Sequence, residues 1–206
     1  MTRLLIVRHG ATQAIEKHIL QGITDSPLSQ QGRQQAEITA LTLETRSIIH
    51  CYSSPLGRAL ETARILCAPL GLEPEINNEM REISFGWMEN THFHFIPHEK
   101  RSQIQKISSF VRFFLVAQYT GERRTHLSQR AFTAWNFLKT QTEAGDILIV
   151  SHGVFISALL KEIFHEDPSG VLNPNRVDAC SITEIELMNQ KPVLVKLNDT
   201  SHLNTL

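Results

Sequence analysis

The chain has 206 residues, of which 41% are hydrophobic and 20% are charged, and its formal net charge at pH 7 is −1. This composition is typical of one folded domain, here residues 1–206, with a sizeable hydrophobic core. Because a nearly neutral chain has no overall field that attracts polyanions, we expect no nucleic acid and no membrane as partner, and any anion site must be local.

The first apolar segment, residues 3–7, predicts a buried strand that runs directly into Arg8, His9 and Gly10. Its apolar stretch is too short for a signal peptide or a membrane span, which favours a cytoplasmic location. A cation, an imidazole and a glycine at a strand end are residue types that suit phosphate chemistry.

Helices and strands alternate in the next part of the chain. Ser29 opens a helix that extends to about residue 45, and residues 47–53 predict a second strand. Pro55 suits the first turn of the following helix, and Gly71 is well placed to end it. The positions expected to pack are Ala36, Ala40, Leu41 and Leu43 in the first helix, and Ala59, Ala63, Leu66 and Leu70 in the second.

The same alternation continues downstream. We expect a helix over residues 125–144 that ends at Gly145, a strand over 146–150 and a helix from about 153 to 164. This strand runs into Ser151, His152 and Gly153, so the junction of strand, histidine and glycine occurs twice. Residues 179–187 and 192–197 alternate between apolar and polar side chains and predict a hairpin at the edge of a sheet.

Strands separated by helices predict an α/β fold, with a mostly parallel sheet flanked by helices on both faces and an edge hairpin near the C-terminus. Residues 90–124 match no motif, and we expect them to form an insertion or cap within the single domain. The sequence leaves the oligomeric state open, and a homodimer is compatible with it.

Two features could indicate metal or redox chemistry. Cys51, Cys67 and Cys180 are widely spaced among mostly apolar neighbours, which favours buried, reduced thiols over disulfides or a zinc site. His92 and His94 alternate and could share one strand face as metal ligands, with His98 nearby in the sequence, but no nearby cysteine or second ligand pair completes a site. We interpret them as ordinary loop histidines and expect no metal and no cofactor.

The residues that could bind or attack a phosphoryl group follow three predicted strands. In a parallel sheet ligands bind at the carboxyl ends of the strands, so His9, the 53–58 turn with Arg58, and His152 should converge there. An arginine fork binds two phosphate oxygens at once, and a neutral imidazole can attack phosphorus. Taken singly, each histidine could be structural and Arg58 could pair loosely with Glu61 on the surface. The joint pattern favours a phosphoryl site.

Several blocks of sequence carry a resemblance to a known family. They are Arg8-His9-Gly10-Ala11-Thr12, Gln21-Gly22, Asp25-Ser26-Pro27-Leu28-Ser29, Gly32, Gln35-Ala36, Ser53-Ser54-Pro55-Leu56-Gly57-Arg58-Ala59-Leu60-Glu61-Thr62-Ala63, Arg81-Glu82-Ile83-Ser84-Phe85-Gly86 and Ser151-His152-Gly153. In these blocks and in their order, across residues 3 to 153, the chain resembles the histidine phosphatase superfamily, also called the phosphoglycerate mutase-like family, and particularly its short members.

The resemblance implies a role for each matching residue. His9 would be the nucleophile that becomes phosphohistidine, and Arg8, Arg58 and His152 would hold the phosphoryl oxygens. Glu82 would be the general acid and then the base, although Glu79 and Glu89 lie in the same loop and could compete with it or form a solvated face with it. The further positions that would line the substrate side are Thr12, Gln21, Gly22 and Gly153.

Three positions depart from the family pattern. Relatives usually carry a small acidic or polar residue where Ala11 stands, an asparagine that contacts phosphate where Ile15 stands, and often an arginine where Ile19 stands. These departures bear on phosphate affinity and on substrate identity.

The resemblance implies a phosphatase of small phosphomonoesters, with alpha-ribazole phosphate as one candidate substrate. A mutase is the nearest alternative, but mutases of this type are generally longer and carry an extended tail over the site. A non-catalytic phosphate-binding module is a third reading, because Ala11 and Ile15 replace polar residues.

Overall fold

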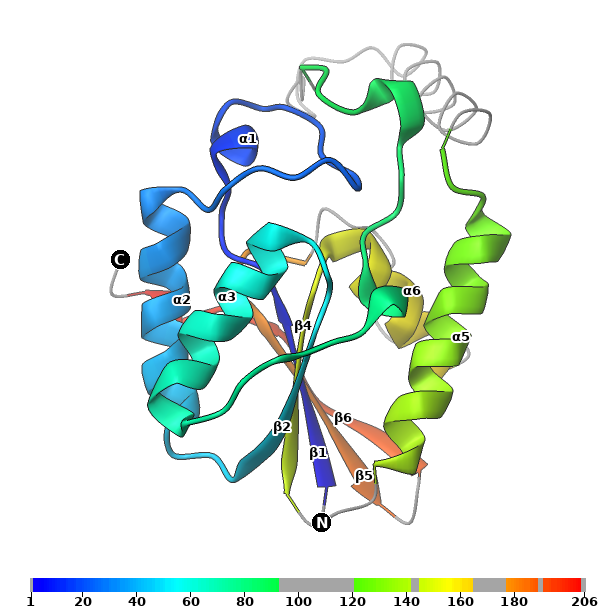
Figure 1. Cartoon of the computed structure of the whole chain (residues 1–206). Coiled ribbons are helices and arrows are strands. Elements are labelled where there is room, and N and C mark those ends of the chain that lie inside the picture. The colour runs from blue at the N-terminus through cyan, green and yellow to red at the C-terminus, as the bar shows by residue number, and fades with distance from the viewer. Residues whose placement is uncertain (1, 93–120, 142–144, 165–176, 189–190, 205–206) are drawn as a thin grey trace, which may run out of the picture.

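The computed structural model describes residues 2–92, 121–141, 145–164, 177–188 and 191–204. Within these ranges the chain forms a six-stranded sheet in the order β3-β2-β4-β1-β5-β6 (Figure 1). The strands are β1 Thr2–Arg8, β2 Ile48–Ser53, β3 Glu75–Ile76, β4 Asp146–Ser151, β5 Ile182–Met188 and β6 Lys191–Asp199. The helices are α1 Gln13–Glu16, α2 Gln30–Leu43, α3 Gly57–Cys67, α5 Arg124–Thr140 and α6 Gly153–Phe164.

The pairing of the strands confirms the predicted α/β class. Strands β3, β2, β4 and β1 are parallel neighbours, whereas β5 joins β1 in the antiparallel sense. Strands β5 and β6 form the predicted antiparallel hairpin, and β6 lies at the sheet edge. The central strand β4 is buried along its whole length, as its unbroken apolar run predicts.

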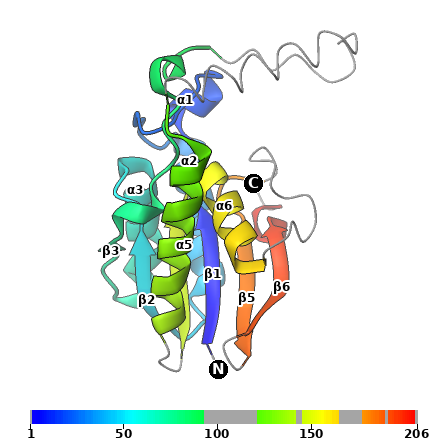
Figure 2. The ribbon, with the colours of Figure 1, turned by 90° about the vertical axis from the view of Figure 1, so that its right-hand side faces the viewer.

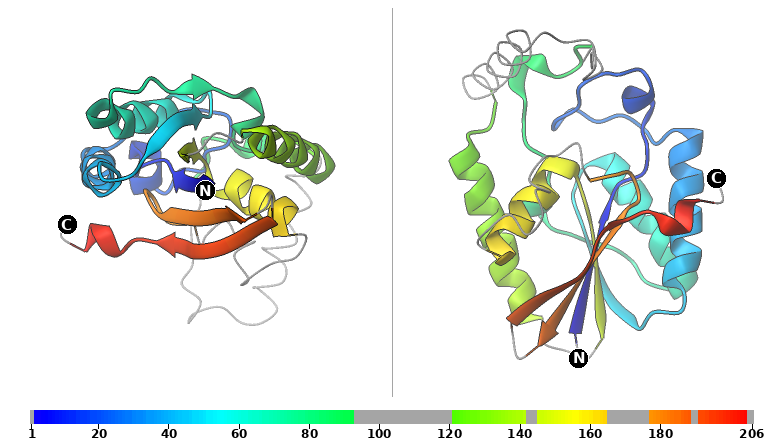
Figure 3. Two further views of the ribbon diagram at one scale, coloured as in Figure 1. Left: turned by 90° about the horizontal axis from the view of Figure 1, so that it is seen from below. Right: turned by 180° about the vertical axis from the view of Figure 1, so that it is seen from behind.

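Helices cover both faces of the sheet, because alternate residues of each strand point to opposite sides. On one face Leu4 and Ile6 pack with α5 and α6, and on the other Leu5 and Val7 pack with α2 and α3. Figure 2 shows α5 and α6 in front of β1, and the view from below in Figure 3 separates this pair of helices from α2 and α3. The carboxyl ends of β1, β2 and β4 point towards the end of the molecule that carries α1.

Helix α2 follows its sequence signals closely, with one exception. Ser29 is its N-cap and accepts a hydrogen bond from the N–H of Gly32 at 3.1 Å. Ala36, Ala40 and Leu43 are buried as predicted, but Leu41 is 66% exposed. That prediction was wrong because Leu41 is rotated by one residue from Ala40, which carries it off the stripe that faces the sheet.

The sequence signals place the ends of α3 closely but miss the end of α5. Helix α3 begins at Gly57, two residues after Pro55, and Gly71 ends the following 3₁₀ turn with a φ of +65°. Helix α5 was predicted to continue to residue 144, but it ends at Thr140 because Gln141 leaves helical geometry, with a ψ of 84°. The segment 142–144 lies outside the described residues.

Several other expectations can be placed in the same way. The three cysteines are buried, as their apolar neighbours predicted. His92 lies near the chain at Lys17, 3.2 Å from its carbonyl oxygen, whereas His94, His98 and most of the expected 90–124 cap lie outside the described residues. In the described ranges, no helix combines the length and the apolar character that crossing a membrane requires.

Candidate active site

The ends of three adjacent strands bring the two histidines together. The backbone N–H of His9 donates to the carbonyl of Ser151 at 2.9 Å, and that of Ser54 donates to the carbonyl of Val150 at 3.0 Å. The chain therefore leaves β1, β2 and β4 at the same level. As a result the ring centroids of His9 and His152, which are 143 positions apart in the sequence (152 minus 9), lie 5.0 Å apart.

The contacts of His9 define its tautomer. Nδ1 lies 2.8 Å from the carbonyl oxygen of Gly10, which can only accept, so the ring hydrogen is on Nδ1. Nε2 accepts a hydrogen bond from Arg58 Nε at 3.3 Å. Burial, followed by the nearby charges of Arg58 and Arg8, holds the pKa of His9 well below its usual range. The ring is therefore neutral with a lone pair on Nε2, which is the nucleophilic form of imidazole.

His152 is oriented by a residue to which the sequence analysis assigned no role. Its Nε2 lies 2.7 Å from Ser54 Oγ, and that hydroxyl already accepts the N–H of Leu56 at 3.2 Å. Among the described residues His152 Nε2 is the one acceptor within reach of this hydroxyl, so we assign the hydroxyl hydrogen to that bond, which leaves the ring hydrogen of His152 on Nδ1. Burial, followed by the charge of Arg58, lowers the pKa of His152 well below its usual value and keeps the ring neutral.

Arg58 is buried with only 1% of its surface exposed, and backbone groups hold it in place. Its Nη2 donates to the carbonyl of Gly22 at 2.7 Å, and its Nη1 donates to the carbonyl of Thr24 at 3.1 Å. Asp25 Oδ1 accepts a further bond from Nη1 at 3.0 Å. Burial lowers the pKa of Arg58, and the carboxylates of Glu82 and Asp25 oppose this effect.

Buried donors without a partner gather among the predicted site residues. In the described ranges, four buried side-chain atoms lack a hydrogen-bond partner: Arg8 Nε, Gln21 Nε2, His152 Nδ1 and Ser181 Oγ. The first three belong to residues predicted to contact substrate, and all three carry hydrogen. Because an unsatisfied buried donor costs about 1–3 kcal/mol, such a group favours an arriving oxyanion.

The contacts of Thr12 determine which atom of the Gln21 amide is available to a ligand. The Thr12 hydroxyl accepts the N–H of Ile15 at 3.2 Å and donates to Gln21 Oε1 at 2.7 Å. This bond fixes the amide oxygen of Gln21, and its Nε2 has no hydrogen-bond partner among the residues that the structure describes. Gly153, the last of the predicted contacts, is buried at the first position of α6.

Glu82 is 7% exposed and lies against the N-terminus of α6. Its Oε1 accepts the N–H of Ile83 at 2.9 Å and that of Phe155 at 3.1 Å, and its Oε2 accepts that of Val154 at 3.2 Å. Burial raises the pKa of Glu82, and the backbone donors and Arg58 oppose this effect. A raised pKa keeps the carboxyl protonated to higher pH, as a general acid requires.

An ion pair behind this loop supports Glu82 and was not expected from the sequence. Arg130 on α5 binds both carboxylate oxygens of Glu122 at 2.7 Å. It also donates to the carbonyls of Glu79 and Arg81, the latter at 2.9 Å. The guanidinium thus ties the backbone just before Glu82 to α5. Residue type alone carries no sign of this, because a helix arginine is usually solvated.

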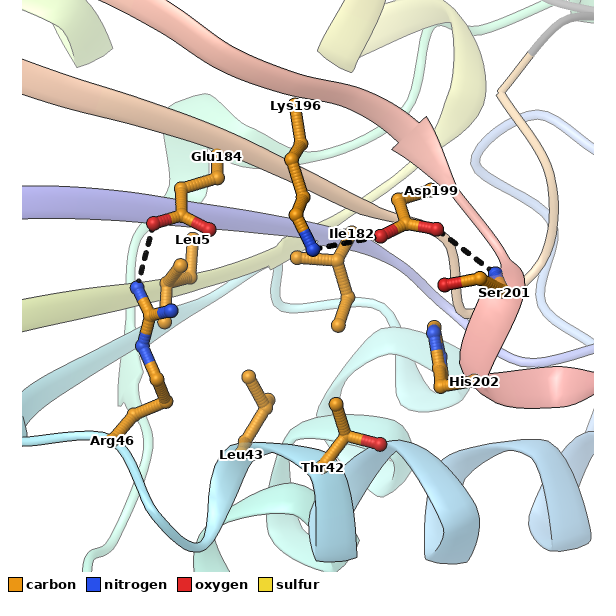
Figure 4. Close-up of a pocket in the computed structure, with 10 residues that line it drawn as sticks. All are labelled: Leu5, Thr42, Leu43, Arg46, Ile182, Glu184, Lys196, Asp199, Ser201 and His202. Carbon is orange, nitrogen blue, oxygen red and sulfur yellow. Dashed lines mark hydrogen bonds and ion pairs between the residues drawn. The ribbon is translucent and has the colours of Figure 1, made fainter.

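A cavity of about 100 Å³ lies elsewhere, between α2 and the β5–β6 hairpin (Figure 4). None of the predicted site residues lines it. Its charged side chains pair with one another, Arg46 with Glu184 at 2.8 Å and Lys196 with Asp199 at 3.1 Å. Because these charges already neutralise one another, the cavity suits a phosphoryl group less well than the strand ends do.

Comparisons with a protein-family model and with individual proteins agree on one family. Residues 4–200 match the sequence model of the histidine phosphatase superfamily, branch 1. A protein named probable phosphoglycerate mutase GpmB from Escherichia fergusonii is 28% identical over 209 residues, which cover 99% of this chain and 96% of that protein.

Two solved structures are similar over nearly the whole chain. A phosphoserine phosphatase mutant from Entamoeba histolytica, in complex with phosphoserine, has a TM-score of 0.78 and 28% identity, covering 98% of this chain and 100% of its own. The alpha-ribazole phosphatase from Shigella flexneri has a TM-score of 0.78 and 27% identity, covering 96% of each chain.

Proposed function

Because the chain belongs to the histidine phosphatase superfamily, we propose that it is a metal-independent phosphatase of small phosphomonoesters that works through a phosphohistidine. The observation that carries this proposal is the state of His9. Its ring is neutral, and its Nε2 lone pair accepts a hydrogen bond from Arg58. Arg8 and His152 each have a buried side-chain donor with no partner in the described part of the chain. These are the groups that an in-line attack on phosphorus needs.

The proposed reaction has two steps. In the first, His9 Nε2 forms a bond to phosphorus, the bond to the ester oxygen breaks, and Glu82 gives its proton to the leaving alkoxide. In the second, Glu82 removes a proton from water, the resulting hydroxide attacks phosphorus, and the bond to Nε2 breaks to release orthophosphate. Arg8, Arg58 and His152 would neutralise the charge on the phosphoryl oxygens in both steps.

A phosphatase transfers the phosphoryl group from His9 to water, and a mutase transfers it back to a substrate hydroxyl. Both begin with the same first step, so a mutase is the nearest alternative. The similar proteins divide between the two activities at nearly the same identity, 28% for the protein named as a mutase and 27–28% for the two phosphatases. We favour hydrolysis because both solved structures reported above carry the name of a phosphatase. Phosphoserine and alpha-ribazole phosphate are therefore the first substrates to try.

The test is release of orthophosphate from an aryl phosphate in the presence of a chelator, followed by a panel of phosphorylated metabolites. We expect turnover of about 1 s⁻¹ or faster on the preferred substrate, which is an ordinary enzymatic rate. Exchange of the phosphoryl group between phosphoglycerates, with little release to water, would identify a mutase instead. Phosphate binding with no turnover on any ester would identify a binding module.

A separate prediction concerns Ile15, which stands where relatives usually carry an asparagine. Ile15 is half-buried on α1, and its apolar side chain cannot donate to a phosphoryl oxygen. We expect Ile15→Asn to tighten vanadate binding and to raise kcat/KM on a small phosphomonoester by about tenfold to a hundredfold, the effect of one hydrogen bond to a charged group. Titration calorimetry and steady-state kinetics measure the two quantities.

Gln13 is one residue that could supply the missing donor in place of Ile15, but its side chain is exposed on the same helix, so Gln13→Ala is the matched control. It should change neither quantity. A bulky apolar ester should lose affinity in Ile15→Asn if Ile15 packs against the substrate body. No change with either ester would mean that Ile15 points away from the site and that the prediction is wrong.

A further inference from the structure

Glu89, which the sequence left as a rival of Glu82, has a different set of contacts. Its carboxylate is half-buried and joins two loops, residues 22–24 and residues 84–86. Within the described part of the chain it accepts five hydrogen bonds. The donors are Ile23 N at 3.3 Å, Thr24 N at 2.7 Å, Thr24 Oγ1, Ser84 Oγ at 3.1 Å and Phe85 N at 2.8 Å.

The 22–24 loop held by Glu89 is also the loop that holds Arg58. The carbonyls of Gly22 and Thr24 accept hydrogen bonds from the two terminal nitrogens of the Arg58 guanidinium. The third nitrogen of that group, Nε, donates to His9 Nε2. A continuous series of hydrogen bonds therefore leads from Glu89 through the loop backbone to Arg58 and then to His9.

Two glycines near Arg58, Gly22 and Gly57, leave room for the carboxylates that hold it in place. A Cβ at Gly22 would collide with the carboxylate of Glu89 and with the carbonyl of Ile83. A Cβ at Gly57 would likewise collide with Asp25, the carboxylate that binds Arg58 directly. Both glycines thus leave space for a carboxylate on the Arg58 side, so Gly22 has a structural reason to be glycine besides the substrate contact implied by the family.

The ionisation of Glu89 suits a supporting group better than a proton donor. Burial acts to raise the pKa of Glu89, but the hydrogen bonds from Thr24, Phe85 and Ile23 outweigh it and the pKa lies below its usual value. The carboxylate stays charged at neutral pH, which strengthens its bonds to the loop N–H groups.

We propose that Glu89 is a positioning residue for phosphoryl transfer, because it fixes the two loop carbonyls that set the orientation of Arg58 beside His9. This inference rests on the proposed function, in which Arg58 binds the phosphoryl oxygens. Its consequence differs from that of a general acid. A misplaced Arg58 weakens every phosphoryl transfer equally, whatever the leaving group.

The first experiment compares Glu89→Gln with wild type. The amide must place its N–H₂ against loop N–H groups, so the 22–24 loop and Arg58 should shift. We expect vanadate to bind about tenfold to a hundredfold more weakly, and kcat/KM to fall by the same factor for aryl and alkyl phosphates. Glu79→Gln is the matched control and should leave both unchanged. A loss confined to alkyl phosphates would overturn the proposal, since it would make Glu89 the acid.

A double-mutant cycle separates positioning from general support of the fold. In an Arg58→Ala background, Glu89→Gln should have little further effect on vanadate affinity, because the group through which it acts is gone. Equal losses in both backgrounds would overturn the proposal. If Glu89→Gln does not fold, Thr24→Val removes one donor to the same carboxylate and should show a smaller loss that also disappears without Arg58.

Vanadate binding also separates this inference from the proposed function. An inactive wild-type protein would refute the phosphatase proposal through its kinetics. The cycle on vanadate affinity would still support or overturn the connection from Glu89 to Arg58, because it requires no turnover.

Discussion

Replacing His9 with alanine should abolish turnover while the protein stays folded. The substitution removes the Nε2 lone pair that attacks phosphorus, and no other described side chain at the site offers a neutral, correctly oriented nucleophile. Loss of a catalytic nucleophile typically lowers kcat by about 10⁴-fold or more. The acid-labile phosphoenzyme that forms when wild type is mixed with a radiolabelled ester should disappear with it.

The fold should tolerate this change because the His9 side chain makes few structural contacts. It bonds to the carbonyl of Gly10 and to Arg58, and the strand itself is held by backbone pairing with β4 and β5. Thermal unfolding followed by circular dichroism checks this. His50→Ala, on β2, is the control and should keep full activity. If His9→Ala retained full activity, the phosphohistidine mechanism would be wrong.

Replacing Glu82 with glutamine should produce a loss that depends on the leaving group. The amide keeps nearly the same shape but cannot donate a proton to an alkoxide. General acid catalysis contributes about 10²-fold to 10⁴-fold, so kcat/KM on alkyl phosphates should fall by that factor. Aryl phosphates leave as stable phenolates and should be affected far less. A plot of rate against leaving-group pKa for both proteins measures the difference.

The pH profile gives this prediction a second readout. Because burial raises the pKa of Glu82, wild type should hold the catalytic proton above the usual range of a carboxyl group and lose activity on alkyl phosphates as pH rises through that pKa. This limb of the profile should be absent in Glu82→Gln. If Glu79→Gln showed this selective loss and Glu82→Gln did not, the assignment of the general acid to Glu82 would be wrong.

The elements and the histidines could be predicted from sequence because their signals are local. The apolar run before His9, the cap at Ser29 and the glycine at 71 each act within a few residues, and the structure has a strand, a helix start and a helix end there. Leu41 and the end of α5 were wrong for a related reason. Leu41 was chosen for its hydrophobic side chain, although it lies off the stripe that faces the sheet. The end of α5 was placed at Gly145, the next residue that commonly ends a helix, whereas the chain leaves helical geometry at Gln141.

The roles of the carboxylates could not be separated in the same way. Glu79, Glu82 and Glu89 have one chemical type and lie within eleven positions of one another. Glu82 differs from the others because it accepts N–H groups of α6 that lie 72 and 73 positions away. Glu89 differs because its partners in the 22–24 loop lie 65 and 66 positions away. Contacts at such separations leave no periodic or local trace.

What the sequence determined by itself is the order of the longer strands and helices, without the short α1 and β3, and the appearance of His9, Arg58 and His152 after strand ends. Both follow from hydrophobic periodicity and short-range capping. Only the tertiary structure decided which ring nitrogen of each histidine carries hydrogen, which carboxyl has a raised pKa and which loop holds Arg58. These properties depend on burial and on hydrogen-bond partners, which exist only after segments distant in sequence have packed together.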